Sequence, residues 1–212
     1  MSNSVLANIR RSLGRTDQTP LGLRPVILEP RLPESVDSEI ASFLDEVKKL
    51  SGVGLKLSPA EIESALKNLV TEQNIRKAAV WNTALLNQLQ IADHLRALGV
   101  ELTSPNADKH EIAECDLGIT EADFILPETG TLVLRSSAEK PRAVSLVPRV
   151  HLAIVTPSAL RADMHQVFAE AKDSHYLVFI TGPSRTADIE LTVTLGVHGP
   201  KNLYVWVIIP RV

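Results

Sequence analysis

The residues best suited to hold a ligand occur together in the segment 181–190, which reads Thr-Gly-Pro-Ser-Arg-Thr-Ala-Asp-Ile-Glu. Gly182 lets the backbone approach a ligand closely, because it carries no side chain. The hydroxyls of Ser184 and Thr186, with free backbone amides beside them, favour an anion. The guanidinium group of Arg185 can bind a carboxylate or a phosphate through two parallel hydrogen bonds. The segment is therefore predicted to bind a small anionic ligand.

Two acids complete this segment and widen its possible roles. Asp188 and Glu190 can hold a ribose hydroxyl, a substrate ammonium group or the neighbouring Arg185. A purely structural interpretation stands beside the functional one. In it, Ser184 and Thr186 only cap a helix, and Arg185 only pairs with one of the acids. Both interpretations are compatible with these residue types.

A second group of polar residues, Glu128-Thr129-Gly130-Thr131, has the composition of a tight turn. A turn presents its carboxylate with little shielding, so Glu128 can act as a general base, a nucleophile or an anchor for a ligand. We take Glu128 as a candidate catalytic residue, and Thr129, Gly130 and Thr131 as candidate ligand-binding residues. An ordinary polar turn is the alternative.

A third turn, Gly196-Val197-His198-Gly199-Pro200, follows the predicted anion site in the chain. The imidazole of His198 can donate to a substrate oxygen. His198 is therefore the second candidate catalytic residue. A histidine that only satisfies nearby backbone carbonyls would look the same in the sequence.

Alternating helices and strands must position these turns. Apolar runs predict strands, and helical spacing with capping residues predicts the helices between them. Helical stretches between strands imply crossover connections, so we predict an α/β fold with a mainly parallel sheet and helices on both faces. Two of the strands flank the turn at 127–130 and are expected to form a hairpin. The expected strands span 77–81, 100–103, 122–126, 131–134, 151–156, 176–181 and 203–209, and the expected helices span 34–50, 58–71, 84–98 and 158–171.

The residues that follow Arg185 carry two conflicting signals. Apolar and polar residues alternate over 187–197, which is the period of a strand. However, buried strands at 176–181 and 203–209 would need a crossover connection if they were parallel, and Ser184 and Gly196 bracket about three helical turns. We therefore predict a helix over this stretch, with a strand as the alternative.

The first 33 residues are expected to form a helical arm. Residues 4–13 have the apolar spacing of a short amphipathic helix. Prolines at positions 20, 25, 30 and 33 then prevent a regular helix and favour an extended connector. We divide the chain into an N-terminal helix with a proline-rich linker, 1–33, and an α/β domain, 34–212. The arm packs on its own domain or reaches a neighbouring subunit.

The composition excludes several classes of function. The 212 residues carry 22 basic and 25 acidic side chains, so the chain lacks the positive balance of proteins that bind nucleic acid. Its single cysteine cannot form an internal disulfide, and no Cys and His residues have metal-ligand spacing, so we expect no metal site. No segment approaches the ~18 continuous apolar residues of a membrane span, and no signal sequence is found. We expect a cytoplasmic protein.

Four stretches of the chain resemble one known family. They are 118–123 (Gly-Ile-Thr-Glu-Ala-Asp), 128–134 (Glu-Thr-Gly-Thr-Leu-Val-Leu), 150–155 (Val-His-Leu-Ala-Ile-Val) and the segment 181–190 with its continuation to 196–200 (Gly-Val-His-Gly-Pro). The chain resembles the LUD domain family, and within it the lactate utilisation protein C group. The last stretch is the most specific.

This resemblance implies a fold and a role. The fold would be a Rossmann-like, three-layer arrangement similar to NagB, ribose-5-phosphate isomerase and CoA-transferase-like proteins. The role would be the oxidation of L-lactate to pyruvate together with iron–sulphur partner proteins. Because this chain has no cysteine cluster, an iron–sulphur centre would have to reside in a partner, and the redox cofactor is unknown.

Three functional hypotheses follow. In the first, the chain is a component of a lactate-oxidising system and binds a small anionic metabolite or a nucleotide-like ligand at the turns 128–131 and 182–200. In the second, it is a non-catalytic sensor or scaffold that binds a nucleotide or a CoA-like molecule. In the third, which rests on fold analogy, it is an isomerase or transferase that acts alone on a sugar phosphate or a CoA thioester. Whether the chain is an enzyme is left open.

Overall fold

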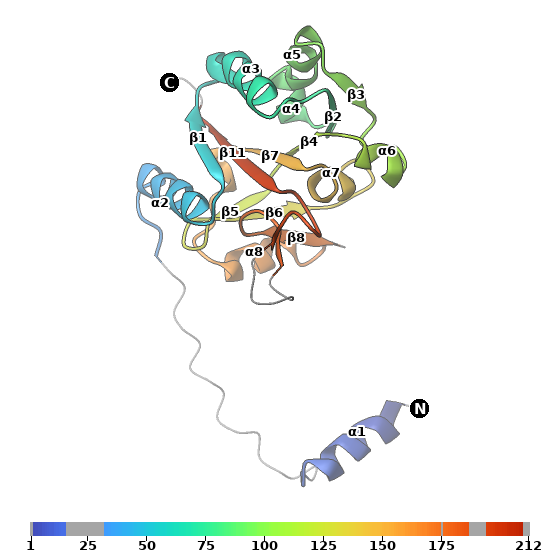
Figure 1. Ribbon diagram of the computed structural model, residues 1–212. Helices are drawn as coiled ribbons and strands as arrows, with labels where there is room; N and C mark the ends of the chain where they lie inside the picture. The colour runs from blue at the N-terminus through green and yellow to red at the C-terminus, as the bar shows by residue number, and fades with distance from the viewer. Residues whose placement is uncertain (1, 16–31, 175, 187–193, 210–212) are drawn as a thin grey trace.

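The protein is built around a six-stranded parallel sheet (Figure 1). The computed structural model describes residues 2–15, 32–174, 176–186 and 194–209. The strands follow the order β1-β11-β7-β4-β2-β3, and every neighbouring pair is parallel. The mainly parallel sheet is thereby confirmed. Its strands are β1 (Val53–Leu57), β2 (Lys77–Val80), β3 (Glu101–Thr103), β4 (Leu117–Glu121), β7 (Val150–Val155) and β11 (Asn202–Ile208).

Helices cover both faces of this sheet, as predicted (Figure 1). One face carries α3 (Ile62–Glu72), α4 (Ala84–Gln88) and α5 (Ile91–Ala97). The other face carries α2 (Val36–Lys49) and α7 (Ala143–Leu146). Glycines on the strands allow the helices of this second face to come close, because Gly54 contacts Leu44 of α2 and Gly118 contacts Val144 of α7. The short elements η1 (Pro59–Glu61), α6 (Lys109–Ala113) and η2 (Pro157–Ala159) connect the layers.

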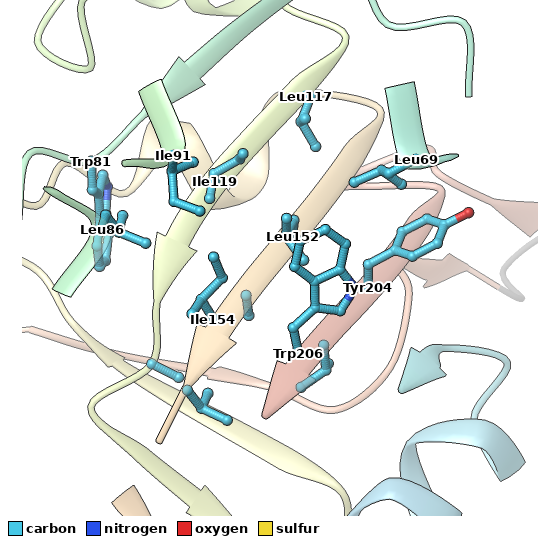
Figure 2. Packing of buried hydrophobic residues seen from close by; sticks show 14 of the residues in the cluster. Leu69, Trp81, Leu86, Ile91, Leu117, Ile119, Leu152, Ile154, Tyr204 and Trp206 are labelled. Atoms are coloured by element: carbon cyan, nitrogen blue, oxygen red, sulfur yellow. The ribbon is translucent and has the colours of Figure 1, made fainter. Parts of the chain in front are cut away.

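Apolar side chains fill the space between the central strands and α3 to α5. Strands that are buried on both faces read as nearly continuous apolar runs, and β7 and β11 have this character. Burial of each large side chain contributes roughly 1.5–3 kcal/mol to stability. Figure 2 shows this layer, formed by Leu117 and Ile119 of β4, Leu152 and Ile154 of β7, Tyr204 and Trp206 of β11, and Leu69 of α3.

A second, three-stranded sheet is antiparallel and has the order β5-β6-β8. It consists of β5 (Phe124–Leu126), β6 (Thr131–Arg135) and β8 (Leu177–Ile180). The predicted hairpin is confirmed as β5 and β6. The interpretation of 176–181 as a partner of the parallel sheet is wrong, because β8 pairs with β6 instead. One face of this sheet joins the main core, and the other packs on α8 (Met164–Ala171).

The predicted helix after Arg185 is also wrong where the structure describes it. Arg185 and Thr186 form β9 (Arg185–Thr186), which pairs antiparallel with β10 (Thr194–Leu195). Since β8 lies outside the parallel sheet, no crossover helix is needed between β8 and β11. At Thr194 and Leu195, which are described, the strand indicated by the local alternation is formed. Residues 187–193 lie outside the described part of the chain.

The helix expected over 84–98 is broken into α4 and α5 at Gln90. This residue has a φ of 51°, in the left-handed region that most side chains avoid. The helix expected over 158–171 is shorter than predicted, because Asp163 caps the start of α8 by accepting a hydrogen bond from the backbone of Gln166. The first departure comes from a left-handed residue and the second from a side-chain cap, each inside an otherwise helical pattern.

The N-terminal arm begins with α1 (Ser2–Ser12), which confirms the predicted short helix. Its apolar side chains Val5, Leu6 and Ile9 are at least half exposed. Residues 16–31, which hold most of the predicted proline-rich linker, lie outside the described part of the chain. None of the helices in the described ranges is long and apolar enough to cross a membrane.

A histidine of the parallel sheet is completely buried. His151 of β7 is inaccessible to solvent, and its Nε2 atom lies 2.9 Å from the hydroxyl of Thr120 on β4. Its Nδ1 atom has no hydrogen-bond partner among the described residues. Burial penalises the charged imidazolium and lowers the pKa of His151 from 6.5 to about 3. His151 is therefore a neutral, structural residue.

This buried histidine predicts a loss of stability in mild acid. The unfolded chain binds a proton below pH 6.5, whereas folded His151 does so only near pH 3, so the free energy of unfolding falls as the pH decreases through this window. Between pH 7 and pH 5 the loss is expected to be about 2 kcal/mol. Urea denaturation of the native chain and of His151→Gln at both pH values measures it. An equal pH dependence in the two proteins would exclude His151 as its source.

Candidate functional site

Two of the predicted turns meet beside the C-terminal end of α2. The hydroxyl of Thr131 lies 2.7 Å from that of Thr129 and 2.8 Å from that of Thr181. Thr131 opens β6, and Thr181 follows β8, the strand that pairs with it. A chain of three hydroxyls therefore joins the turn 128–131 to the start of the segment 181–190.

The glycines of these two turns are required by the backbone. Gly130 and Gly182 have φ values of +61° and +83°, which glycine adopts at little cost. Both also face α2 too closely for a side chain. A Cβ atom on Gly130 would lie 2.9 Å from the backbone nitrogen of Val47, and one on Gly182 would lie 3.0 Å from the Cβ atom of Leu50. These glycines let both turns pack on the end of the helix.

Arg185 has a structural partner at the same place. Its Nη2 atom donates to the backbone carbonyl of Leu50 and to the hydroxyl of Ser51, the latter at 3.2 Å. Leu50 ends α2, where carbonyl oxygens lack partners within the helix and carry partial negative charge. A cation is stabilising there. The guanidinium predicted to clamp a ligand thus also tethers the segment 181–186 to α2.

The third turn joins this surface through Ser184. The backbone amide of Ser184 donates to the carbonyl of Pro200 at 3.0 Å, and Gly196 donates to the carbonyl of Ser184 at the same distance. Ser184 therefore continues into β9 and does not cap a helix. His198, on this turn, is exposed. Thr186 pairs with Thr194 across β9 and β10, and the predicted ligand residues Asp188 and Glu190 lie outside the described residues.

Glu128 lies in an acidic neighbourhood. It lines a shallow depression of about 250 Å³ together with Asp45, Glu46 and Lys49 of α2. Lys49 Nζ is already 2.8 Å from Asp45 and 2.7 Å from Glu46. Three carboxylates and one ammonium group therefore meet here. The carboxylate of Glu128 is exposed, as its prediction as a catalytic residue requires.

These turns do not lie at the carboxyl ends of the parallel strands. They pack on α2 just before Gly52, which contacts Leu203 near the start of β11 and directly precedes β1. The turn surface, defined as Thr129, Thr131, Thr181 and Arg185, is therefore on the amino side of the parallel sheet. The rule that places ligands at the carboxyl ends of parallel strands does not extend to the strand 176–181, because that strand belongs to the antiparallel sheet.

The same rule points to another place in the molecule, between β2 and β4. The chain runs from β2 outward to β3 and then returns to β4 on the opposite side of β2. Such a reversal of strand order opens a crevice beyond the carboxyl ends of the two strands, where open α/β sheets bind ligands. The residues that follow these ends are 81–83 and 121–123.

Charged and polar side chains form a connected network in this crevice. The hydroxyl of Thr83 donates to Glu121 Oε2 at 2.7 Å. Lys140 Nζ lies 3.0 Å from Glu121 Oε1 and 3.2 Å from Asp123 Oδ1. The three charged side chains are only 10 to 22% exposed, so their interactions are screened less than those of surface pairs. We call Thr83, Glu121, Asp123 and Lys140 the switch-point network.

Lys140 is held in place by the loop that carries it. The backbone amide of Lys140 donates to the Ser137 hydroxyl at 3.2 Å, and the indole Nε1 of Trp81 donates to the Pro141 carbonyl at 3.0 Å. The Lys140 ammonium also lies 5.7 Å from the centre of the Trp81 ring, within reach of a cation–π interaction. Arg135 balances the charge of the second acid, since its Nε atom lies 3.3 Å from Asp123 Oδ1, and its backbone amide also donates to Asp123 at 2.7 Å.

A cleft of about 510 Å³ adjoins the network. Trp81 connects the two, because it lines the cleft and contacts the loop that carries Lys140. Thr83, Glu121, Asp123 and Lys140 do not themselves line the cleft. The network offers a carboxylate that can accept a proton and an ammonium group that can bind an anion. Among the described residues, no three His, Cys, Asp or Glu side chains are grouped as metal ligands.

Sequence reasoning missed Thr83 and Lys140. Thr83 is 38 residues from Glu121 in the chain, and Lys140 is 19 residues from it, so no local motif joins them. The acids at 121 and 123 were visible as neighbours of the predicted hairpin. The one available signal was their position after an apolar strand, which is the usual place of ligand-binding residues in an α/β fold.

Comparison with known proteins finds one matching domain and several similar proteins. The LUD domain matches residues 40–208. The chain is 32% identical over 213 residues to lactate utilization protein C of Halalkalibacterium halodurans, covering 93% of each protein. It is 31% identical over 219 residues to lactate utilization protein C of Shouchella clausii, covering 96% of each.

A solved structure supports the fold. The crystal structure of a DUF162 family protein from Deinococcus radiodurans is similar, with a TM-score of 0.62 over 83% of this chain and 99% of that one. The sequence identity between the two proteins is 22%, so this similarity supports the fold alone. The domain match covers most of the residues from α2 to β11. The chain belongs to the LUD domain family.

Proposed function

We propose that the chain is a component of an L-lactate utilisation system, in which it binds a small anionic metabolite. Relatives named lactate utilization protein C align with it along nearly their whole length, which supports this role. The proposal includes oxidation of L-lactate to pyruvate with iron–sulphur partner proteins that accept the electrons.

The observation that carries the site is the position of the switch-point network. L-lactate has a carboxylate and a hydroxyl on adjacent carbons. In our proposal Lys140 binds the substrate carboxylate. This carboxylate replaces Asp123 as the second partner of Lys140, while the guanidinium of Arg135 continues to balance Asp123. Glu121, held by Thr83, then accepts the hydroxyl proton. The C2–H bond must also break, and its hydrogen leaves as a hydride equivalent, one proton with two electrons, to an acceptor in the partner proteins. Lactate thereby loses two protons and two electrons and becomes pyruvate.

The turn surface is a second proposed place for the anion. The bond between Thr131 and Thr181 favours it, because it joins two segments that were predicted separately to bind a ligand. There Arg185 would bind the carboxylate, with Glu128 or His198 handling the proton. Arg185 would have to exchange its contact with the Leu50 carbonyl for the ligand, which lowers the net gain.

Growth of a deletion strain tests the role. Removal of the gene is expected to prevent growth on L-lactate as the sole carbon source and to leave growth on pyruvate intact, since only the step between the two acids is lost. A plasmid copy of the native gene should restore growth on L-lactate. Undiminished growth of the deletion strain on L-lactate would exclude the proposed role.

A further inference from the structure

The cleft beside the switch-point network has an apolar floor. Trp81, Leu86 and Ile91 are fully buried and lie next to one another where β2 meets α4 and α5 (Figure 2). Leu102 of β3 adds a partly buried side chain. The apolar surface open to a ligand comes from Val80, Ala92, Leu102 and Pro105, which line the cleft and are only partly buried. The flat face of a ring can pack on this surface with release of water from both.

The rim of the cleft is rich in carboxamides. Asn82, Asn87 and Gln90 line it, and Asn87 Nδ2 donates to Asn82 Oδ1 at 2.8 Å. Each carboxamide offers two N–H donors and an oxygen acceptor, so this bond uses only part of what the pair can provide. The charged residues of the rim, Asp93 and Arg96, pair with each other at 2.7 Å. The rim is thus polar and formally neutral.

Gln90 stands in a conformation that does not suit its residue type. It follows the C-terminal end of α4 with φ 51° and ψ 33°, a position usually taken by glycine. A side chain there strains the backbone, and such strain in folded proteins gathers at functional positions. Gln90 lines the cleft, where a glycine would offer no polar side chain.

From these observations we infer that the cleft binds a nucleoside-type ligand, whose planar heteroaromatic base lies on the apolar floor. The carboxamides of Asn82, Asn87 and Gln90 would recognise the donors and acceptors on the edge of the base. The volume of about 510 Å³ falls in the range of small-molecule sites. The cleft is also lined by residues at the carboxyl ends of β2 and β3, the side of the sheet on which open α/β folds bind ligands.

The charge of the rim limits the ligand further. Arg96 is already neutralised by Asp93, so the cleft offers no group for several phosphates. The base is therefore the part that the cleft recognises. The inference goes beyond the proposed role in lactate utilisation and does not depend on it, because the base would contact other residues than Glu121 and Lys140.

Calorimetric titration of the full chain with adenosine, guanosine, cytidine and uridine tests the inference, with free ribose as the control ligand. At least one nucleoside is expected to bind, and ribose is not. The variant Gln90→Gly should bind that nucleoside about tenfold more weakly, because it loses one carboxamide. Its melting temperature should rise by about 2–4 °C, because glycine relieves the strain.

Asn74→Gly is the matched control, because Asn74 has a similar φ of 49° and lies outside the cleft. It is expected to bind the nucleoside as the native chain does. The combination of a more stable protein and weaker binding in Gln90→Gly distinguishes a ligand contact from a structural role. Failure of all four nucleosides to bind the native chain, or equal binding by Gln90→Gly, would overturn the inference. Neither result would affect the growth experiment.

Discussion

Replacement of Lys140 by methionine is expected to lower L-lactate oxidation by about 100-fold. Methionine keeps much of the length of the side chain but removes the charge that, in our proposal, binds the substrate carboxylate. Loss of one member of a largely buried ion pair costs about 2–5 kcal/mol, and 100-fold corresponds to the lower half of this range. Pyruvate formation from L-lactate in extracts of the complemented deletion strain measures the effect.

Two further variants accompany this experiment, one as a control and one as a second test of the network. Lys56→Met removes a lysine whose only ion-pair partner among the described residues is the exposed Asp37, and it should retain full activity. Glu121→Gln keeps a group that can accept from Thr83 but removes the proton acceptor, and it should be as inactive as Lys140→Met. Melting temperatures show whether each variant is folded. A folded Lys140→Met protein with native activity would refute the proposed role of this lysine.

Gly118→Ala is expected to destabilise the fold severely. Gly118 lies in β4, and a Cβ atom there would sit 1.8 Å from the carbonyl oxygen of Val144 on α7. That carbonyl belongs to the backbone, so the whole helix would have to move away from the sheet. We expect a loss of about 3 kcal/mol or more, which corresponds to roughly 6–12 °C in melting temperature. Urea denaturation followed by circular dichroism measures it.

Gly99→Ala separates this steric effect from backbone strain. Gly99 has a φ of +78°, but nothing lies within 4 Å of the place that an alanine methyl group would take, so alanine there should cost only about 1–2 kcal/mol. Equal stability of the two variants would mean that α7 does not pack on β4 as closely as described.

Local signals were enough to predict the layers of the fold. The apolar runs of β7 and β11, and the glycine turn at 127–130, are encoded within a few residues each. The strand β1 was missed because it contains Gly54 and Lys56, which weaken the apolar pattern of a short edge strand. A strand or turn was therefore predicted where a few neighbouring residues carry a clear pattern, and it was missed where that pattern is weak.

The assignment of strands to sheets could not be read in this way. Leu177 to Ile180 look like a strand of either sheet, and only the pairing with β6 decides between them. The error then spread to the next segment, because a crossover helix was inferred from a sheet partner that does not exist. The strand-like alternation after Arg185, which agrees with β10 in the described residues, was set aside for an incorrect long-range inference.

The candidate sites illustrate the same limit. The residues of the turn surface were found because they stand side by side in the sequence, whereas Thr83, Glu121 and Lys140 come together only through the fold. Some motif residues also have structural reasons to be present, since Gly130 and Gly182 pack on α2 and Arg185 binds its last turn. Sequence motifs therefore locate constrained positions, and the constraint can be packing, binding or both.

Crystals of the protein soaked in pyruvate and in L-lactate test most directly whether the switch-point network binds the substrate carboxylate. We predict carboxylate density within hydrogen-bonding distance of Lys140 Nζ, beyond the carboxyl ends of β2 and β4, and no such density in crystals of Lys140→Met. Density beside Thr131, Thr181 and Arg185, with none at Lys140, would contradict the assignment and place the ligand on the turn surface instead.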